Sequence, residues 1–160
     1  MITTAGREES IAFCRNVLHA DEVIDYRTED VVTRVQALTD GRGVPVVIDT
    51  VGGDTFLSSL DCAAVNGQIV TILGSNTADR GRGLLYRNVT IHYEFMGIPT
   101  AYEIEPERPG NILSSIANLV DGGLLRPHVS HRFALEKVAE GHRQVETART
   151  IGKVAIIVRR

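Results

Sequence analysis

Residues 44–53 read VPVVIDTVGG, an apolar and mostly β-branched run that ends in two glycines. A strand with one face in water alternates apolar and polar side chains, whereas an unbroken apolar run is typical of a strand covered on both faces, as in a parallel sheet. Residues 68–74, QIVTILG, have the same character, and residues 54–65 have the apolar spacing of a helix. Asn66 and Gly67 predict a turn, so this part of the chain is expected to form a β-α-β unit.

The same alternation of strands and amphipathic helices continues in both directions along the chain. The expected strands are residues 1–5, 23–24, 44–49, 68–74, 88–97, 129–135 and 152–158, and the expected helices are residues 8–18, 28–39, 54–65, 109–123 and 135–147. Thr28, Glu29 and Asp30 are candidate caps for the second helix. Strands that alternate with helices in this way predict an α/β fold, a parallel sheet with helices on both faces.

The composition indicates a globular protein. Its 160 residues suffice for one domain with one hydrophobic core. The net charge of -3 indicates neither a nucleic-acid nor an anionic-membrane partner. No apolar run reaches the roughly 20 residues of a membrane span, and the first residues lack a signal-peptide pattern, so we expect a cytoplasmic protein. Cys14 and Cys62 are expected to be buried apolar side chains and not a disulfide.

Ligands of open parallel sheets bind beyond the carboxyl ends of the strands, so the residues that follow each expected strand are the candidate binding residues. They are Ala5, Gly6, Arg7, Tyr26, Thr50, Val51, Leu73, Gly74, Ser75, Phe95 and Met96. Four more residues, Asp25, Asp49, Gly52 and Gly97, lie at the same strand ends and are given no binding role. Glycine lets the backbone approach a ligand closely, and the planar guanidinium of Arg7 suits a phosphate.

Several of these residues also have a purely structural explanation. Arg7 can be a solvated residue at a helix start, and Tyr26 can end a strand with its hydroxyl in water. Thr50 can be present for its β-propensity, and Gly74 can serve a tight turn only. Both interpretations are open for each residue alone, and the shared position at strand ends favours a binding site.

Three stretches in order resemble one enzyme family. They are ADEVIDYRTED (20–30), GRGVPVVIDTVGGDTFLSSLDCAAVNGQIVTILG (41–74) and HRFALEKVAEGHRQVETARTIGKVAIIV (131–158). They resemble the carboxyl-terminal half of medium-chain dehydrogenase/reductases, in the quinone oxidoreductase-like and zinc-type alcohol dehydrogenase-like branch. The resemblance implies an incomplete Rossmann-type doubly wound parallel sheet. It also implies a partial NAD(P)-binding domain over residues 1–126 and a tail, residues 127–160, that returns to the catalytic domain.

The resemblance also implies which part of a dinucleotide each residue meets. Gly6 and Arg7 would lie by the adenosine ribose, where an aspartate would repel a 2′-phosphate. This sequence has a cation there instead, which favours NADP, as NADPH, over NAD. By the same resemblance, Tyr26 would lie by the adenine and its phosphate. Thr50 and Val51 would line the cofactor trough, Leu73, Gly74 and Ser75 would lie near the nicotinamide ribose, and Phe95 and Met96 would meet the carboxamide.

Metal chemistry is not expected in this chain. His128 and His131 are three residues apart on an extended segment, where alternation points them to opposite faces, so they are expected to bind no zinc. No local pattern identifies a catalytic residue.

The resemblance implies a preceding first strand and a glycine-rich turn that this sequence does not contain. The usual strand order, 3-2-1-4-5-6, places that strand between two that are present. We therefore expect two inner edges that either close on each other or pair with another copy of the chain in a homo-oligomer.

Two functions follow from the sequence. The first is the cofactor-binding half of an NADPH-dependent oxidoreductase, which takes part in hydride transfer to a quinone or enone or from an alcohol, and which is inactive alone. The alternative is a non-catalytic fragment or an oligomerising module that keeps the fold without binding the cofactor. Whether this chain alone is an enzyme is left open between them.

Overall fold

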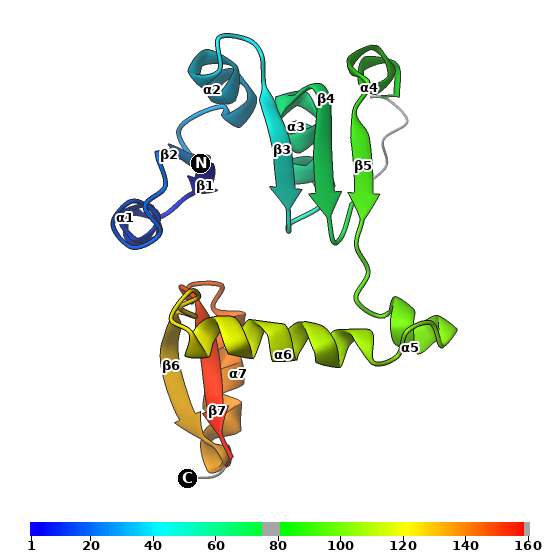
Figure 1. Ribbon diagram of the computed structural model, residues 1–160. Coiled ribbons are helices and arrows are strands. Elements are labelled where there is room, and N and C mark those ends of the chain that lie inside the picture. The colour runs from blue at the N-terminus through cyan, green and yellow to red at the C-terminus, as the bar shows by residue number, and fades with distance from the viewer. Residues whose placement is uncertain (75–80, 159–160) are drawn as a thin grey trace. The chain divides into compact units, whose positions relative to one another are not determined.

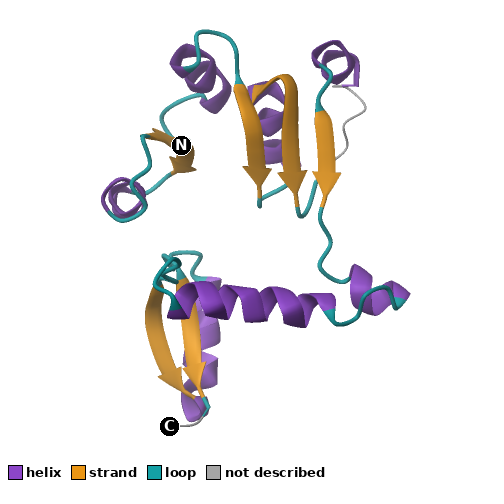
Figure 2. Ribbon diagram, viewed as in Figure 1, coloured by secondary structure: helices purple, strands orange, loops and turns teal. Residues whose placement is uncertain are grey.

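The computed structural model describes residues 1–74 and 81–158. The chain divides into two compact units, Met1–Phe95 and Met96–Arg160, which we call the first and the second unit. The described strands pair in parallel within three separate sheets, and helices pack on them (Figures 1 and 2). The prediction of an α/β fold with parallel strands is confirmed.

The first unit alternates strands and helices from its first residues. In chain order its elements are β1 (Ile2–Ala5), α1 (Glu8–Asn16), β2 (Glu22–Asp25), α2 (Val31–Leu38), β3 (Val44–Asp49), α3 (Gly53–Cys62), β4 (Ala63–Thr71), α4 (Gly81–Arg87) and β5 (Thr90–Tyr93). The predicted cap of α2 is Asp30, whose side chain accepts a hydrogen bond of 2.8 Å from the backbone N–H of Thr33.

The first two strands form a two-stranded sheet with a helix on each face. On one face the buried Ala5 and Val23 pack against α1 through Ile11. On the other face Ile24, which is 1% exposed, packs against Val35 of α2. Successive strand residues point to opposite faces, so a helix covers each side of this sheet, as predicted.

The next three strands form a sheet in the order β3-β4-β5. Phe56 and Leu60 of α3 are fully buried against Ile69 of β4 and form the largest part of this core. The register of β3 and β4 ends on the pair Asp49 and Thr71. The carboxyl ends of both strands therefore lie at the same edge of the sheet (Figure 1).

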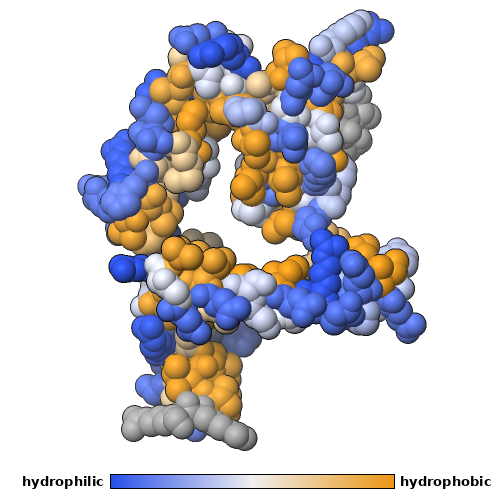
Figure 3. Space-filling model, in the orientation of Figure 1, coloured by the Kyte–Doolittle hydropathy of each residue, from blue (hydrophilic) through white to orange (hydrophobic). Residues whose placement is uncertain are grey.

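The other face of β3 is open. Val46 and Ile48 are 56% and 75% exposed, although the sequence has the pattern of a strand covered on both faces. The space-filling view shows apolar side chains on the surface in this region (Figure 3). An exposed apolar strand of this kind is a surface on which another element can pack.

The two sheets of the first unit do not join. Within the described residues β1 pairs with β2 alone, and β3 pairs with β4 alone, so one edge of β1 and one edge of β3 lack a partner. The expectation that these two edges close on each other is wrong. The alternative, pairing with another copy, stays a prediction.

The passage from α3 to β4 differs from the prediction. Ala63, Ala64 and Val65 were expected in a helix and belong to β4. The expected turn at Asn66 and Gly67 lies inside that strand, where Asn66 has φ +59° and the register with β3 shifts. The strand therefore continues through a bulge.

The second unit contains helices and a small two-stranded sheet. Its elements are α5 (Ile98–Tyr102), α6 (Arg108–Asp121), β6 (Val129–Ala134), the 3-10 turn η2 (Leu135–Lys137), α7 (Val138–Glu146) and β7 (Lys153–Ile157). Helix α7 packs closely on the β6–β7 sheet at Gly141, where an added Cβ would lie 2.9 Å from Ile156. The predicted helices and strands of this part are confirmed, whereas α4 and α5 were not predicted.

Two further features concern the chain as described. None of its helices is long and apolar enough to cross a membrane. Both cysteines are free thiols, and Cys62 is buried while Cys14 is half-buried, in keeping with the prediction of apolar packing. Burial raises the pKa of the Cys62 thiol to about 11, and the nearby Asp61 charge adds to that shift. A thiol with this pKa is protonated at neutral pH and is a weak nucleophile.

Arg87 of α4 should contribute to the stability of the first unit. Its guanidinium donates to the carbonyl oxygens of Leu60 at 2.8 Å and Ala63 at 2.9 Å, where α3 ends and β4 begins. Arg87→Met removes these donors and should lower the free energy of unfolding by about 1–3 kcal/mol. Urea denaturation measures the change. Arg82→Met, at an exposed position of the same helix, is the control, and equal effects of the two substitutions would contradict the assignment.

Candidate functional site

The candidate site is the set of loops that follow the carboxyl ends of the parallel strands in the two sheets of the first unit. We call it the strand-end rim, and it comprises the loops after β1, β2, β3, β4 and β5. All the predicted binding residues of this unit lie on the rim except Ser75, which is outside the described residues. Both backbone turns and side chains form the rim.

The loops after β1 and β2 meet at a glycine. An added Cβ at Gly6 would lie 2.7 Å from the Tyr26 hydroxyl oxygen, so only glycine allows the tyrosine ring to lie against this backbone. The N–H of Tyr26 donates to the carbonyl of Ala5 at 3.3 Å, which joins the two loops. The structure thus brings together Ala5, Gly6 and Tyr26, with the tyrosine 56% exposed.

Arg7 lies at the start of α1. It is the N-cap residue, with extended backbone at φ -133° and ψ 143°, and its carbonyl accepts the helix bond from Ile11 at 2.9 Å. The next two residues, Glu8 and Glu9, are acidic and lie in the first helical turn. Arg7 therefore lies where β1 passes into α1. This position is compatible with a solvated residue at a helix start and with a residue that binds a phosphate.

A buried carboxylate joins the loops after β3 and β4. Asp49 is 3% exposed and Thr71 is 1% exposed. The Thr71 hydroxyl donates to Asp49 Oδ2 at 2.9 Å, and the backbone N–H of Gly52 donates to the same oxygen at 3.1 Å. Thr71 Oγ1 in turn accepts from the N–H of Gly74 at 2.9 Å and of Leu73 at 3.3 Å. The two loops are therefore one hydrogen-bonded unit.

The outward side of the same loops carries predicted binding residues. Val51 and Leu73 are 64% and 67% exposed, and Thr50 is also exposed. Behind them, Gly74 has φ +65°, and a Cβ there would lie 2.6 Å from Cε1 of Tyr93. The glycine is required both by its backbone conformation and by the ring beside it.

Phe95 and Met96 lie at the junction of the two units. Phe95 is the last residue of the first unit and Met96 the first of the second, and their side chains are 62% and 84% exposed. They follow β5, as the sequence predicted.

No metal centre is found among residues 1–74 and 81–158, which hold no group of three or more His, Cys, Asp or Glu side chains arranged to bind an ion. His131 instead accepts or donates a hydrogen bond of 2.9 Å with the Ser130 hydroxyl, and its ring stacks on Phe133 at a centroid distance of 6.3 Å.

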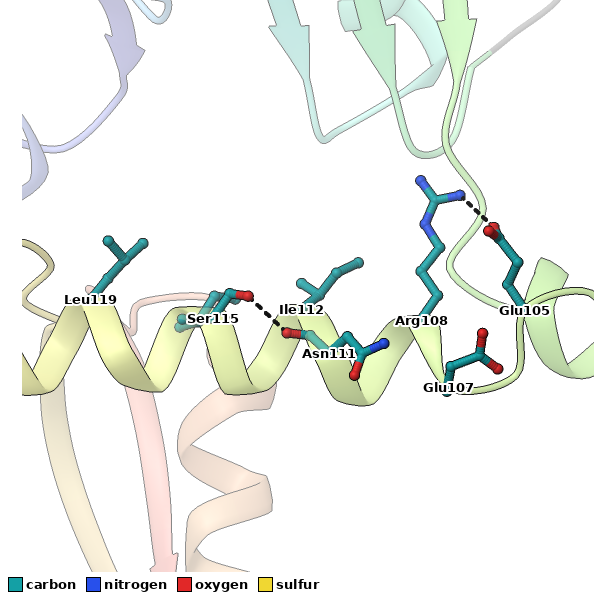
Figure 4. A pocket seen from close by; sticks show the side chains of 8 residues that line it. Glu105, Glu107, Arg108, Asn111, Ile112, Ser115 and Leu119 are labelled. Carbon is teal, nitrogen blue, oxygen red and sulfur yellow. Dashed lines mark hydrogen bonds and ion pairs between the residues drawn. The ribbon is translucent and has the colours of Figure 1, made fainter.

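An open groove on α6 contains none of the predicted binding residues. Its lining includes Ile112, Ile116 and Leu119, which are 40–50% exposed, and the ion pair between Arg108 and Glu105 at 3.4 Å. Figure 4 shows Ile112 and Leu119 projecting from the helix. The Ser115 hydroxyl of this lining donates to the backbone carbonyl of Asn111 at 2.9 Å and not to a base, so we do not assign the groove as an active site.

Thr71 was not among the predicted site residues, and Asp49 was placed at a strand end but was given no binding role. The sequence does carry a signal, because an acidic residue ends one buried strand and a threonine lies within the next. Their hydrogen bond depends on the register of the two strands, which pairs Asp49 with Thr71. The bulge in β4 shifts the strand register, so the pairing of Asp49 with Thr71 could not be worked out from the predicted strand boundaries.

The chain is similar to known oxidoreductases. The family model described as zinc-binding dehydrogenase matches residues 18–156. A quinone oxidoreductase of Pseudomonas aeruginosa is 34% identical over 140 residues, which make up 85% of this chain and 42% of that protein. Among solved structures, Escherichia coli quinone oxidoreductase complexed with NADPH has a TM-score of 0.75 at 26% identity, and it covers 98% of this chain and 49% of that one.

An NAD-dependent alcohol dehydrogenase is also similar, with a TM-score of 0.77 at 28% identity over 99% of this chain and 43% of that one. This chain therefore spans about half the length of the proteins it matches.

The backbone of Gly52 should tolerate no side chain. Gly52 has φ +76° and ψ -167°, a region open almost only to glycine, and an added Cβ would lie 2.7 Å from the Leu73 Cβ. Gly52→Ala should lower the free energy of unfolding by about 2–4 kcal/mol. Gly53→Ala is the matched control, because Gly53 has φ +56° with open space around it, and it should cost about 1 kcal/mol. Urea denaturation that ranks the two in the opposite order would refute the assigned geometry.

Proposed function

The chain belongs to the zinc-binding dehydrogenase family, and we propose that it is the cofactor-binding half of an NADPH-dependent oxidoreductase. The substrate of the whole protein is a quinone, an enone or an alcohol, and the reaction is hydride transfer. The observation that carries the proposal is the strand-end rim, because open parallel sheets bind nucleotides beyond the carboxyl ends of their strands. The chain spans about half of its relatives, so the activity proposed is that of a longer protein.

The residues of the rim fit a dinucleotide. Gly6 and Gly74 have no side chain to hold a ligand away from the backbone, and each has a tyrosine ring beside it. Thr50, Val51 and Leu73 are exposed on the outward side of the loops. Such a surface combines apolar contact area with a few polar groups, which is typical of cofactor sites.

We propose NADPH over NADH as the cofactor because of the charge at the end of β1. Arg7 follows this strand, and no aspartate is present in the loop to repel a 2′-phosphate. The E. coli relative that was solved with NADPH supports this choice. The NAD-dependent relative has the same fold, so the choice depends on the residues of the loop and not on the fold.

When bound, the nicotinamide supplies the hydride chemistry. The residues of this chain would hold the cofactor and orient it, with Arg7 and Tyr26 at the adenosine end and Leu73, Gly74 and Ser75 nearer the nicotinamide. Phe95 and Met96 would meet the carboxamide. No residue of this chain is assigned a catalytic role.

The proposed function also implies a division of the chain into two parts. Residues 1–126 would form the NAD(P)-binding domain, and residues 127–160 would return to the catalytic domain. The protein would act in the cytoplasm on a small-molecule substrate, without nucleic acid or membrane as a partner, and this chain would contain no zinc site.

A second candidate function is an oligomerising module. It is favoured by the edges of β1 and β3 that have no strand partner in residues 1–74 and 81–158, and by the exposed Val46 and Ile48 on β3. Unpaired edges of parallel strands are ready templates for pairing with another chain. In this case two copies would associate through these edges, with or without bound cofactor.

Titration with NADPH tests the first proposal. The pyrophosphate seat implied by the family is absent from this sequence, so we expect weak binding, with a dissociation constant near 100 μM, or roughly 5.5 kcal/mol. Thermal shift and NADPH fluorescence measure it, and no turnover is expected. An unchanged melting temperature at millimolar NADPH would favour the non-catalytic alternative.

The same titration on charge variants tests the role of Arg7. Arg7→Gln should weaken NADPH binding about five-fold while NADH binding changes little, because a partly exposed ion pair with the 2′-phosphate contributes about 1 kcal/mol. Arg15→Gln is the matched control, since Arg15 lies in the last turn of the same helix. Equal weakening by both variants would show a general charge effect and not recognition by Arg7.

Sedimentation velocity tests the oligomerising module. Ile48→Lys should shift the chain toward the monomer, because it places a charge on the open face of the unpaired strand. Leu85→Lys is the control, as Leu85 on α4 is also 75% exposed but is not on a strand. A monomeric wild-type chain, or equal effects of the two substitutions, would exclude association through this strand.

A further inference from the structure

We propose that Asp49 and Thr71 are positioning residues for the cofactor, because they join the loops after β3 and β4 into one unit. The inference rests on the proposed function and extends it to two residues that need not touch the ligand. Asp49 and Thr71 are register partners at the ends of their strands. They therefore lie where both loops begin.

The direction of every hydrogen bond in this network is determined by the groups involved. Thr71 Oγ1 lies 2.9 Å from Asp49 Oδ2 and 2.9 Å from the backbone nitrogen of Gly74. A backbone N–H can only donate and a carboxylate can only accept, so the single hydroxyl proton must point to Asp49. The lone pairs of the hydroxyl are then free to accept from the loop after β4.

The carboxylate holds the other loop in the same way. Both oxygens of Asp49 accept from the N–H of Gly52, at 3.1 and 3.3 Å. A direct backbone bond of 3.2 Å from Gly53 to the carbonyl of Gly74 closes the connection. A change at Thr71 should therefore be felt at Gly52, on a loop to which Thr71 does not belong.

Burial makes this connection hard to replace. Asp49 and Thr71 are 3% and 1% exposed, so water has little access to a partner that loses its bond. Within the described residues, no buried side-chain polar atom lacks a hydrogen-bond partner. In such surroundings a fully bonded polar network orders the segments that it joins.

The network orders the segments that carry the exposed candidate contacts. Val51 and Leu73 are 64% and 67% exposed on the two loops, while the backbone beside each of them is bonded inward to Asp49 or Thr71. A ligand that spans both loops requires a fixed distance between them. If the network already holds the loops at that distance, less conformational entropy is lost on binding.

A purely structural role is the competing explanation, and the chain offers a matched control for it. Thr39 ends α2 with a similar pair of bonds: its hydroxyl donates to the Val35 carbonyl at 2.8 Å and accepts from the N–H of Gly43 at 3.0 Å. Gly43 directly precedes β3, so Thr39 acts at the end of that strand opposite the rim.

The experiment compares Thr71→Val, Thr71→Ser and Thr39→Val in the full chain. Amide hydrogen exchange followed by NMR reports the coupling, and NADPH titration reports the positioning. Thr71→Val should speed exchange at Gly52 about ten-fold and weaken NADPH binding about ten-fold, and Thr71→Ser, which keeps the hydroxyl, should restore both. Thr39→Val should speed exchange at Gly43 and leave Gly52 and NADPH binding as in the wild type.

Each other outcome overturns part of the proposal. Unchanged exchange at Gly52 in Thr71→Val would show that the loops are not coupled. Faster exchange with NADPH binding weakened no more than in Thr39→Val would show that the network is structural only. If the wild-type chain does not bind NADPH, the proposed function and the positioning role both fail, and the exchange data still decide whether the loops are coupled.

Discussion

Parallel pairing of β3 with β4 is the constraint on which the candidate site depends. Two parallel strands joined by a helix must end at the same edge, so the loops that follow them are neighbours in space although 22 residues separate Asp49 from Thr71. The core of α3 against Ile69 holds this pairing. From it come the Asp49 to Thr71 hydrogen bond, the left-handed glycines of both loops and the exposed row of Thr50, Val51 and Leu73.

The division of the first unit into two sheets is the other main property of this chain. Helix α2 contacts elements of both sheets, because its Val35 shares a buried cluster with Ile24 of β2 and Cys62 of α3. Side-chain packing thus connects two sheets that share no backbone hydrogen bonds in the described residues. The apolar pattern of β3 is typical of a strand covered on both faces, whereas Val46 and Ile48 on one of its faces are exposed.

Much of the fold could be predicted because apolar periodicity depends on local sequence. The β-branched run at Val44–Asp49 is a strand, and the residues after Asp30 form a capped helix, both as expected. The end of α3 could not be predicted in this way. Ala63 and Ala64 are compatible with a helix. However, Arg87, which is 27 and 24 residues further along the chain, donates hydrogen bonds to the carbonyl oxygens of Leu60 and Ala63, and the chain continues as a strand.

The candidate site, too, could be predicted only in part. The sequence alone determined the parallel α/β class, the family and the residues that follow each strand, because these depend on local pattern and order. Only the tertiary structure decided that Gly6 lies under the Tyr26 ring, that Asp49 meets Thr71, and that β1 and β3 each keep one unpaired edge among the described residues. Such contacts depend on strand register and on packing between distant segments, which no local stretch of sequence contains.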